Sequence, residues 1–237
     1  KTTPLFQRIL GARHLVVSEN IWIYRGRSRG NIALIRHLRP IPQIVDMIYP
    51  IWGIIISTYC IQNVVASASL GTELDLNKLL LQMDGAEYDP QVFPGLVFRL
   101  KEPKTATLLF RSGKMVCTGA KTIDQVRRAI ETVVVHVRKA GVTITEAPTY
   151  EVQNIVASAD LGQPVNLTSV VISLGLERVE YEPEVFPGLV YRMTDPKVVI
   201  LLFGSGKLVC TGARTPQDVE VAVEKIGEEL RSADLLR

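Results

Sequence analysis

The chain is poor in the residues that build cross-links, metal centres and catalytic sets. Its 237 residues include three cysteines, too few for the disulfide framework of a secreted protein, so a reducing compartment is expected. No cluster of His and Cys has metal-ligand spacing, and no Ser-His-Asp set or glycine-rich phosphate loop is evident. The sequence therefore favours a protein that is not an enzyme and binds no cofactor.

Long uninterrupted apolar runs are missing as well. Residues 44–60 are apolar, but Asp46 and Pro50 interrupt them, and the stretch falls short of a membrane-spanning helix. Residues 1–20 lack the continuous apolar core of a secretory signal. We therefore expect a protein that neither spans a membrane nor is secreted.

Residues 61–237, the larger part of the chain, have nearly balanced charges. Residues 1–60 hold eight Lys/Arg and two Asp/Glu, whereas residues 61–237 hold nineteen and twenty-two. The net charge of +3 therefore comes from the N-terminal quarter. Nucleic-acid binding by the rest cannot be argued from net charge.

What the sequence does contain is a long internal repeat. Residues 88–120 match residues 181–213 at 22 of 33 positions without a gap. Residues 61–71 match residues 152–162 at 8 of 11 positions. The spacing between equivalent residues is 91 in this earlier match and 93 in the later one, which places a two-residue insertion within 167–178. A duplication of this length predicts a pseudo-twofold molecule.

Each copy has the pattern of a strand, a helix, several strands and a second helix. Residues 75–83 carry leucines at helical spacing, and Thr122 and Thr215 are typical N-caps of two longer helices. We therefore expect residues 58–147 and 148–237 to form two equivalent α+β repeats.

Residues 1–57 match nothing in the repeat. They contain a basic cluster at residues 25–30 and two apolar runs that prolines interrupt. Two interpretations are open: an N-terminal extension without an assigned role, or a basic arm that contacts nucleic acid or a partner.

Alternation along the strands predicts two apolar faces in each copy. The helices can cover only one of them. The other carries Val, Leu and Phe with one Asn and one Thr per copy. A large exposed apolar patch marks a binding surface, unless a partner copy or the N-terminal segment buries it in a sandwich.

Basic residues recur in register around this face. Charges on strand edges also keep edges apart, so each alone is weak support. An apolar floor with a basic rim suits the minor groove of DNA, which offers mainly acceptors at A·T pairs. The recurring residues are Arg99, Lys104, Lys114 and Lys121, which match Arg192, Lys197, Lys207 and Arg214.

The duplicated motifs resemble those of the TATA-binding protein family. They are Gln-Asn-Val-Val-Ala, Phe-Pro-Gly-Leu-Val-Phe-Arg, Glu-Pro-Lys, Ser-Gly-Lys-Met-Val and Thr-Gly-Ala-Lys, and the likeness covers residues 59–237. The resemblance implies a pseudo-twofold saddle, in which a ten-stranded curved antiparallel sheet carries four helices on its convex face. It also implies a general transcription factor that binds the minor groove of TATA-box DNA, bends it by inserting phenylalanines and nucleates the preinitiation complex. The close similarity of the two copies resembles archaeal members more than eukaryotic ones.

The resemblance further implies a role for each residue that matches a family motif. Phe93 and Phe110 would wedge one end of the DNA site, and Phe186 and Phe203 the other. Contacts to base acceptors near the centre would come from Asn63, Asn154, Thr118 and Thr211. The floor would be lined by Val65, Val116, Val156, Val209, Leu108 and Leu201. Backbone contacts would come from Arg99, Arg192, Lys104, Lys197, Lys114 and Lys207.

Acidic residues distinguish the second Phe-Pro-Gly motif from the first. By resemblance, Glu182 and Glu184 would dock transcription factor B and so lead to the RNA polymerase assembly, with the protein a monomer on DNA. The alternative is a solvated acidic turn. An archaeal protein would act in the cytoplasm at the nucleoid, a eukaryotic one in the nucleus.

Two other functions fit parts of the pattern. A saddle-shaped adaptor that binds protein without specific DNA binding would be expected to have lost groove-facing residues, and none is lost. A DNA glycosylase that shares this half-fold would need a helix-hairpin-helix segment and a catalytic Asp or Lys, for which the chain has no room.

Overall fold

The computed structural model describes residues 12–18, 21–26, 34–35, 59–175 and 177–236. The chain divides into two compact units, Lys1–Ile56 and Ser57–Arg237. Within the described residues, no helix is both long and apolar enough to cross a membrane.

The first unit contains a small antiparallel sheet with the strand order β1-β2-β3. Its strands are β1 (Ala12–Ser18), β2 (Ile21–Gly26) and β3 (Leu34–Ile35). Val16 is paired with Ile23, and Trp22 with Ile35. The sequence pattern did not reveal these strands, and residues 27–30 of the expected basic cluster lie outside the described residues.

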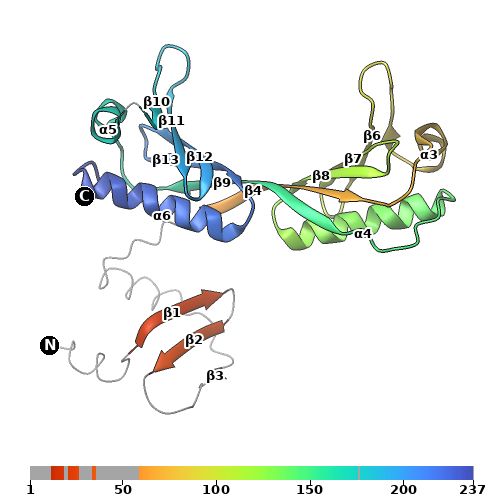
Figure 1. Cartoon of the computed structure of the whole chain (residues 1–237), viewed down its shortest axis with the longest axis horizontal. Helices are drawn as coiled ribbons and strands as arrows, with labels where there is room; N and C mark the ends of the chain where they lie inside the picture. Colours follow the sequence, from red (N-terminus) through yellow and green to blue (C-terminus); the bar gives the residue numbers. More distant parts are fainter. Residues whose placement is uncertain (1–11, 19–20, 27–33, 36–58, 176, 237) are drawn as a thin grey trace. The chain divides into compact units, whose positions relative to one another are not determined.

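The second unit is built on a ten-stranded antiparallel sheet, as the family resemblance predicts (Figure 1). The first copy supplies β4 (Tyr59–Ser69), β5 (Ala86–Glu87), β6 (Leu96–Leu100), β7 (Thr105–Leu109) and β8 (Lys114–Ala120). The second supplies β9 (Tyr150–Asp160), β10 (Val179–Glu180), β11 (Gly188–Thr194), β12 (Lys197–Phe203) and β13 (Lys207–Ala213).

The strand order shows the pseudo-twofold directly. It reads β10-β11-β12-β13-β9-β4-β8-β7-β6-β5, so each half mirrors the other about the β4–β9 pair. Equivalent residues have equivalent partners: Leu108 is paired with Val116 in the first copy, and Leu201 with Val209 in the second. The duplication in the sequence is therefore a duplication of the fold.

Four helices accompany this sheet: α3 (Leu76–Gln82), α4 (Ile123–Lys139), α5 (Leu167–Leu174) and α6 (Pro216–Ser232). The expected caps are present, because Thr122 accepts a hydrogen bond from the Gln125 N–H and Thr215 forms a capping box with Asp218. Helix α4 packs on β8 and β4, and α6 on β13 and β9. The sheet curves away from these two helices, which leaves its opposite face concave (Figure 1).

The core lies between the sheet and the helices. Val64, Ala66, Ile155 and Ala157 point into it from the two central strands and are fully buried. Cys117 and Cys210, which occupy equivalent positions in the two copies, are also fully buried. Burial raises the pKa of the Cys210 thiol to about 11, with a smaller contribution from Asp218, so it stays protonated. The thiols therefore act as small apolar groups.

Helix α4 contains one histidine. The His136 ring is half-buried and its centroid lies 5.1 Å from that of Phe98. Its Nδ1 is 2.9 Å from the carbonyl oxygen of Thr132. Apolar periodicity does not indicate this position, because an imidazole can pack one face and keep a polar atom satisfied.

Two threonines in β7 allow a test of core polarity. Thr107 and Thr105 lie where the second copy has Ile200 and Val198. Thr107 is fully buried and its Oγ1 has no hydrogen-bond partner among the described residues, whereas Thr105 Oγ1 donates to the Pro103 carbonyl oxygen at 3.2 Å. A buried unpaired hydroxyl costs about 1–3 kcal/mol.

We expect Thr107→Val to raise the free energy of unfolding by about 1 kcal/mol and Thr105→Val to lower it by about as much. Urea unfolding followed by circular dichroism measures both, and a less stable Thr107→Val variant would contradict the assignment.

Candidate nucleic-acid interface

The concave face carries the apolar residues that the strand alternation predicted. In β4, Val65 is half-buried while its neighbours Val64 and Ala66 are fully buried beneath it. The two long helices of the second unit pack on the opposite face. The same half-buried state holds for all six expected floor residues: Val65, Val116, Val156, Val209, Leu108 and Leu201.

An asparagine and a threonine in each copy form the polar centre of this face. Asn63 Oδ1 accepts a hydrogen bond from the Gly119 N–H at 2.7 Å, and its Nδ2 lies 3.1 Å from Thr118 Oγ1. The second copy repeats this arrangement: Asn154 Oδ1 accepts from the Gly212 N–H at 2.7 Å and Nδ2 lies 3.3 Å from Thr211 Oγ1. The backbone donors hold the carbonyl side of each amide. Each amide therefore presents its NH₂ group in a fixed direction.

Glycine is required for this arrangement. Gly119 and Gly212 have φ values of +93° and +97°, a region that other residues rarely adopt. The strand pairing is irregular beside these glycines. The register shifts between Val64 and Ala66 where β4 pairs with β8, and between Cys210 and Ala213 where β13 pairs with β9. The irregular backbone brings the glycine N–H groups to the asparagine carbonyls.

Sequence reasoning missed a second set of polar contacts beside the asparagines. Gln62 Nε2 donates to Ser158 Oγ, and Gln153 Nε2 to Ser67 Oγ, both at 2.8 Å. Each bond joins one copy to the other across the β4–β9 pair. The signal was available, because Gln-Asn and the later serine recur in both copies, but cross-copy contacts depend on the register shifts beside Gln62 and Gln153.

The four expected wedge phenylalanines form two matching pairs. Ring centroids of Phe93 and Phe110 lie 5.9 Å apart at 64°, and those of Phe186 and Phe203 lie 5.9 Å apart at 65°. All four rings are half-buried. The glycine of each Phe-Pro-Gly motif leaves room for them, since a Cβ at Gly95 would lie 2.7 Å from the Phe93 ring. The motif thus sets an edge-to-face ring pair at each end of the concave face.

The basic residues expected to contact the DNA backbone differ in their surroundings. Arg99 Nη1 lies 2.8 Å from Glu87 Oε2, and Arg192 forms a two-point contact with Glu180 at 3.1 and 3.2 Å. All four of these side chains are more than half exposed. The expected lysines are exposed and form no ion pair with the described residues: Lys104, Lys197, Lys114 and Lys207.

The acidic loop before the second Phe-Pro-Gly motif is exposed. The N–H groups of Val185 and Phe186 both donate to the Glu182 carbonyl oxygen at 2.9 Å, which folds the loop into a tight turn. Glu182 and Glu184 are exposed, and the Val185 side chain is 79% exposed. Glu180, from the same acidic stretch, is instead engaged with Arg192. Two carboxylates and an aliphatic side chain therefore remain available at this tip.

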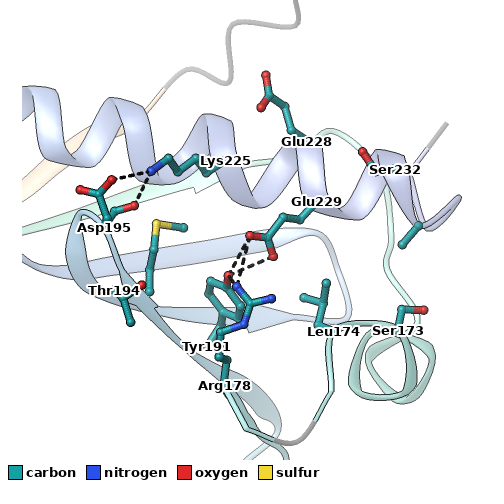
Figure 2. Close-up of a pocket in the computed structure, with 12 residues that line it drawn as sticks. Ser173, Leu174, Arg178, Tyr191, Thr194, Asp195, Lys225, Glu228, Glu229 and Ser232 are labelled. Carbon is teal, nitrogen blue, oxygen red and sulfur yellow. Dashed lines mark hydrogen bonds and ion pairs between the residues drawn. The ribbon is translucent and has the colours of Figure 1, made fainter.

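A hollow of about 950 Å³ lies on the helix side of the second copy (Figure 2). The buried Tyr191 hydroxyl donates to the Glu229 carboxylate, whose oxygens lie 2.9 and 3.0 Å away, and it accepts from Arg178 Nη1 at 3.1 Å. Burial, and then Glu229, raises the pKa of Tyr191 to about 12. Among the described residues, no three His, Cys, Asp or Glu side chains gather as a metal site. The hollow therefore holds a satisfied structural network.

Known proteins share this sheet and these motifs. The sequence profile described as "Transcription factor TFIID (or TATA-binding protein, TBP)" matches residues 58–140 and 149–233. The chain belongs to the TATA-binding protein family. It is 54% identical over 176 residues to the TATA-box-binding protein of Archaeoglobus fulgidus, a match that covers 74% of this chain and 96% of that protein. It is 55% identical over 179 residues to TATA-box-binding protein B of Halobacterium salinarum, with 76% and 96% covered.

A solved structure gives the same result for the fold. The Methanococcus jannaschii TBP is 46% identical and superposes with a TM-score of 0.68, covering 73% of this chain and 98% of that one. The family consists of DNA-binding transcription factors and not of enzymes.

The Tyr191 network generates a test at alkaline pH. A folded-state pKa above the usual value of about 10 stabilises the fold below pH 10, and this stabilisation is lost as pH rises through about 12. The upward shift of the Tyr191 pKa contributes at most about 2.7 kcal/mol to the free energy of unfolding. We expect the unfolding free energy to fall between about pH 9.5 and 11.5 by more in the unaltered chain than in Tyr191→Phe. Urea unfolding at both pH values measures the difference; equal slopes would contradict the assignment.

Proposed function

We propose that the concave face binds the minor groove of TATA-box promoter DNA, bends the duplex and nucleates the preinitiation complex. The observation that carries the proposal is the half-buried apolar floor with a phenylalanine pair at each end and fixed amide donors at its centre. Relatives from two archaea are named TATA-box-binding proteins. An apolar patch of this extent is typical of an interaction surface.

The amide geometry favours A·T pairs. In the minor groove these pairs offer only acceptors, whereas a G·C pair adds the guanine amino donor. Asn63 and Asn154 have their carbonyl oxygens occupied by backbone N–H groups and direct one amide hydrogen at a threonine, so each keeps one donor hydrogen for a base. A fixed donor pairs with adenine N3 or thymine O2 and clashes with the guanine amino group. The two asparagines would thus select A·T pairs at the centre of the site.

The phenylalanine pairs suit the two ends of a bent site. An apolar ring inserted between base pairs replaces part of the stacking that a kink removes. Phe186 and Phe203 are held edge-to-face in the free protein, so little ordering is needed on insertion. The same geometry at Phe93 and Phe110 would kink the other end.

Some of the basic side chains at the rim already form ion pairs with carboxylates of the protein. The exposed lysines can bind phosphates directly, but Arg99 and Arg192 already hold carboxylates. A phosphate must share each arginine with Glu87 or Glu180, or displace that carboxylate. Such ion pairs contribute about 0–1 kcal/mol when exposed, so exchange costs little. The glutamates would therefore lower the positive charge of the free rim while leaving Arg99 and Arg192 able to bind phosphate.

The acidic loop supplies the contact with the transcription machinery. Glu182 and Glu184 are exposed beside Val185, which suits a basic partner surface with an apolar pocket. We assign this partner as transcription factor B, which would recruit the RNA polymerase assembly to a monomer on DNA. The archaeal relatives favour action in the cytoplasm at the nucleoid.

Groove recognition is tested by fluorescence anisotropy with a TATA duplex and a scrambled G·C duplex of equal length at one salt concentration. We expect at least about 10³-fold tighter binding to the TATA duplex. Phe186→Ala and Phe203→Ala should each weaken it by about 10–100-fold and reduce bending, because the kinked step loses its stacking partner. End-to-end fluorescence transfer measures the bend.

A matched control separates insertion from general damage near the motif. Val92 is 82% exposed beside Phe93, so Val92→Ala should leave both affinity and bending unchanged. Equal affinity for the two duplexes would contradict promoter recognition and favour an adaptor. Unchanged bending in both phenylalanine variants would contradict the wedge.

The acidic loop is tested by reversing its charge. Glu182→Arg combined with Glu184→Arg should abolish the ternary complex with transcription factor B on a TATA duplex, because like charges would then face each other. Binding of the protein alone to DNA should remain within about 3-fold, since the loop lies outside the concave floor. Gel-shift titration measures both complexes, and parallel loss of both would argue against a separate docking site.

A further inference from the structure

The outward faces of α4 and α6 differ although the helices are equivalent. Helix α4 has four Lys/Arg and two Asp/Glu, whereas α6 has two and five. Along α4 one exposed stripe contains Arg128, Glu131, Val135 and Arg138. Along α6 the matching stripe contains Val221 and Glu228, which are exposed, and Asp218 and Lys225, which are half-buried on its flank. Val135 is 48% and Val221 40% exposed, so each stripe includes an aliphatic side chain open to contact.

The two stripes are complementary when they run antiparallel. With Val135 set against Val221, the helix geometry places Arg128 opposite Glu228. The same register sets Glu131 against Lys225 and Arg138 against Asp218. Every charged position of one stripe then meets the opposite charge, and the two valines meet each other.

Pairing α4 with a second α4, or α6 with a second α6, does not bring opposite charges together. Two antiparallel α4 stripes would set Arg128 against Arg138, and two α6 stripes would set Asp218 against Glu228. Like charges at directly opposed positions are destabilising. The pattern therefore selects α4 with α6 and disfavours either helix with itself.

These side chains differ in the contacts that they already make. Arg138 donates to the Ile144 carbonyl oxygen at 2.9 Å, and Asp218 accepts from the N–H groups of Arg214 and Thr215, so this third pair keeps those contacts and adds only long-range attraction. Glu228 has no ion pair or hydrogen bond with the described residues, and it points away from the sheet while Glu229 points toward Tyr191 (Figure 2). Arg128 and Glu131 hold exposed partners within α4. Lys225 binds Asp195 at the surface. Exposed pairs of this kind contribute about 0–1 kcal/mol, so exchanging them costs little.

We propose that the chain self-associates through α4 of one copy packed antiparallel on α6 of another. The two surfaces differ, so the contact is heterologous and a dimer leaves one α4 and one α6 free for further copies. A single helix pair buries less than a standard interface, which sets the affinity in the micromolar range or weaker. Both helices lie on the convex side of the sheet, so association leaves the concave face open.

Sedimentation equilibrium of the full chain over about 5–500 µM tests the proposal at about 50 mM and about 1 M salt. The weight-average mass should rise with concentration at low salt and fall toward the monomer at high salt. Arg128→Glu and Glu228→Arg should each weaken association at least about 10-fold. The double variant Arg128→Glu/Glu228→Arg should restore it to within about 3-fold of the unaltered chain, because opposite charges face each other again.

Two controls keep the result interpretable. Glu220→Arg makes the same charge change on α6 outside the stripe and should leave association unchanged. Val135→Asp and Val221→Asp should each weaken it, and circular dichroism with thermal unfolding checks that every variant is folded. A chain that stays monomeric throughout, single reversals without effect, or a double variant that fails to recover would each overturn the proposal.

Discussion

The pairing of β4 with β9 is the contact on which the rest of the second unit depends. It joins the two copies into one sheet, and both asparagines of the concave face lie on these two strands, where Val65 faces Asn154 and Asn63 faces Val156. The cross-copy bonds from Gln62 and Gln153 flank them. A shift in this register would break the cross-copy bonds from Gln62 and Gln153 and move the floor residues of one copy to the wrong face relative to those of the other. The relative placement of the two asparagines therefore depends on this pairing.

Side chains alternate between the two faces of the sheet, so one face packs the core and the other is open to a binding partner. Residues that point toward α4 and α6 are almost all fully buried, whereas their neighbours remain half-buried on the concave side. Leaving such a face open forgoes the stabilisation that its burial would give, about 25 cal/mol for each Å². The helix-side core must supply the stability of the unit by itself. Thr107, unpaired in that core, shows that packing in the first copy is not optimal, while the second copy has isoleucine there.

Much of the fold could be predicted because duplication supplies each pattern twice. The strands, the capped helices and the two phenylalanine pairs each follow from motifs that recur at a fixed spacing. The Gln62–Ser158 bond could not be predicted, because it depends on a register shift between strands of different copies. The pairing of Arg192 with Glu180 could not either, since it joins neighbouring strands whose alignment the sequence does not state. Strands β1–β3 have no counterpart in the repeat, so no internal comparison indicated them.

A nearly symmetric concave face cannot distinguish the two directions along DNA. The ring pairs match within one degree, and the asparagine networks have the same partners in both copies. Any directional information must therefore come from surfaces where the copies have diverged. Two such surfaces are exposed: the loop tip, where Glu182 and Glu184 replace Asp89 and Gln91, and the outward stripes of α4 and α6. Since both lie off the concave floor, partners that bind them can orient the complex without touching that floor.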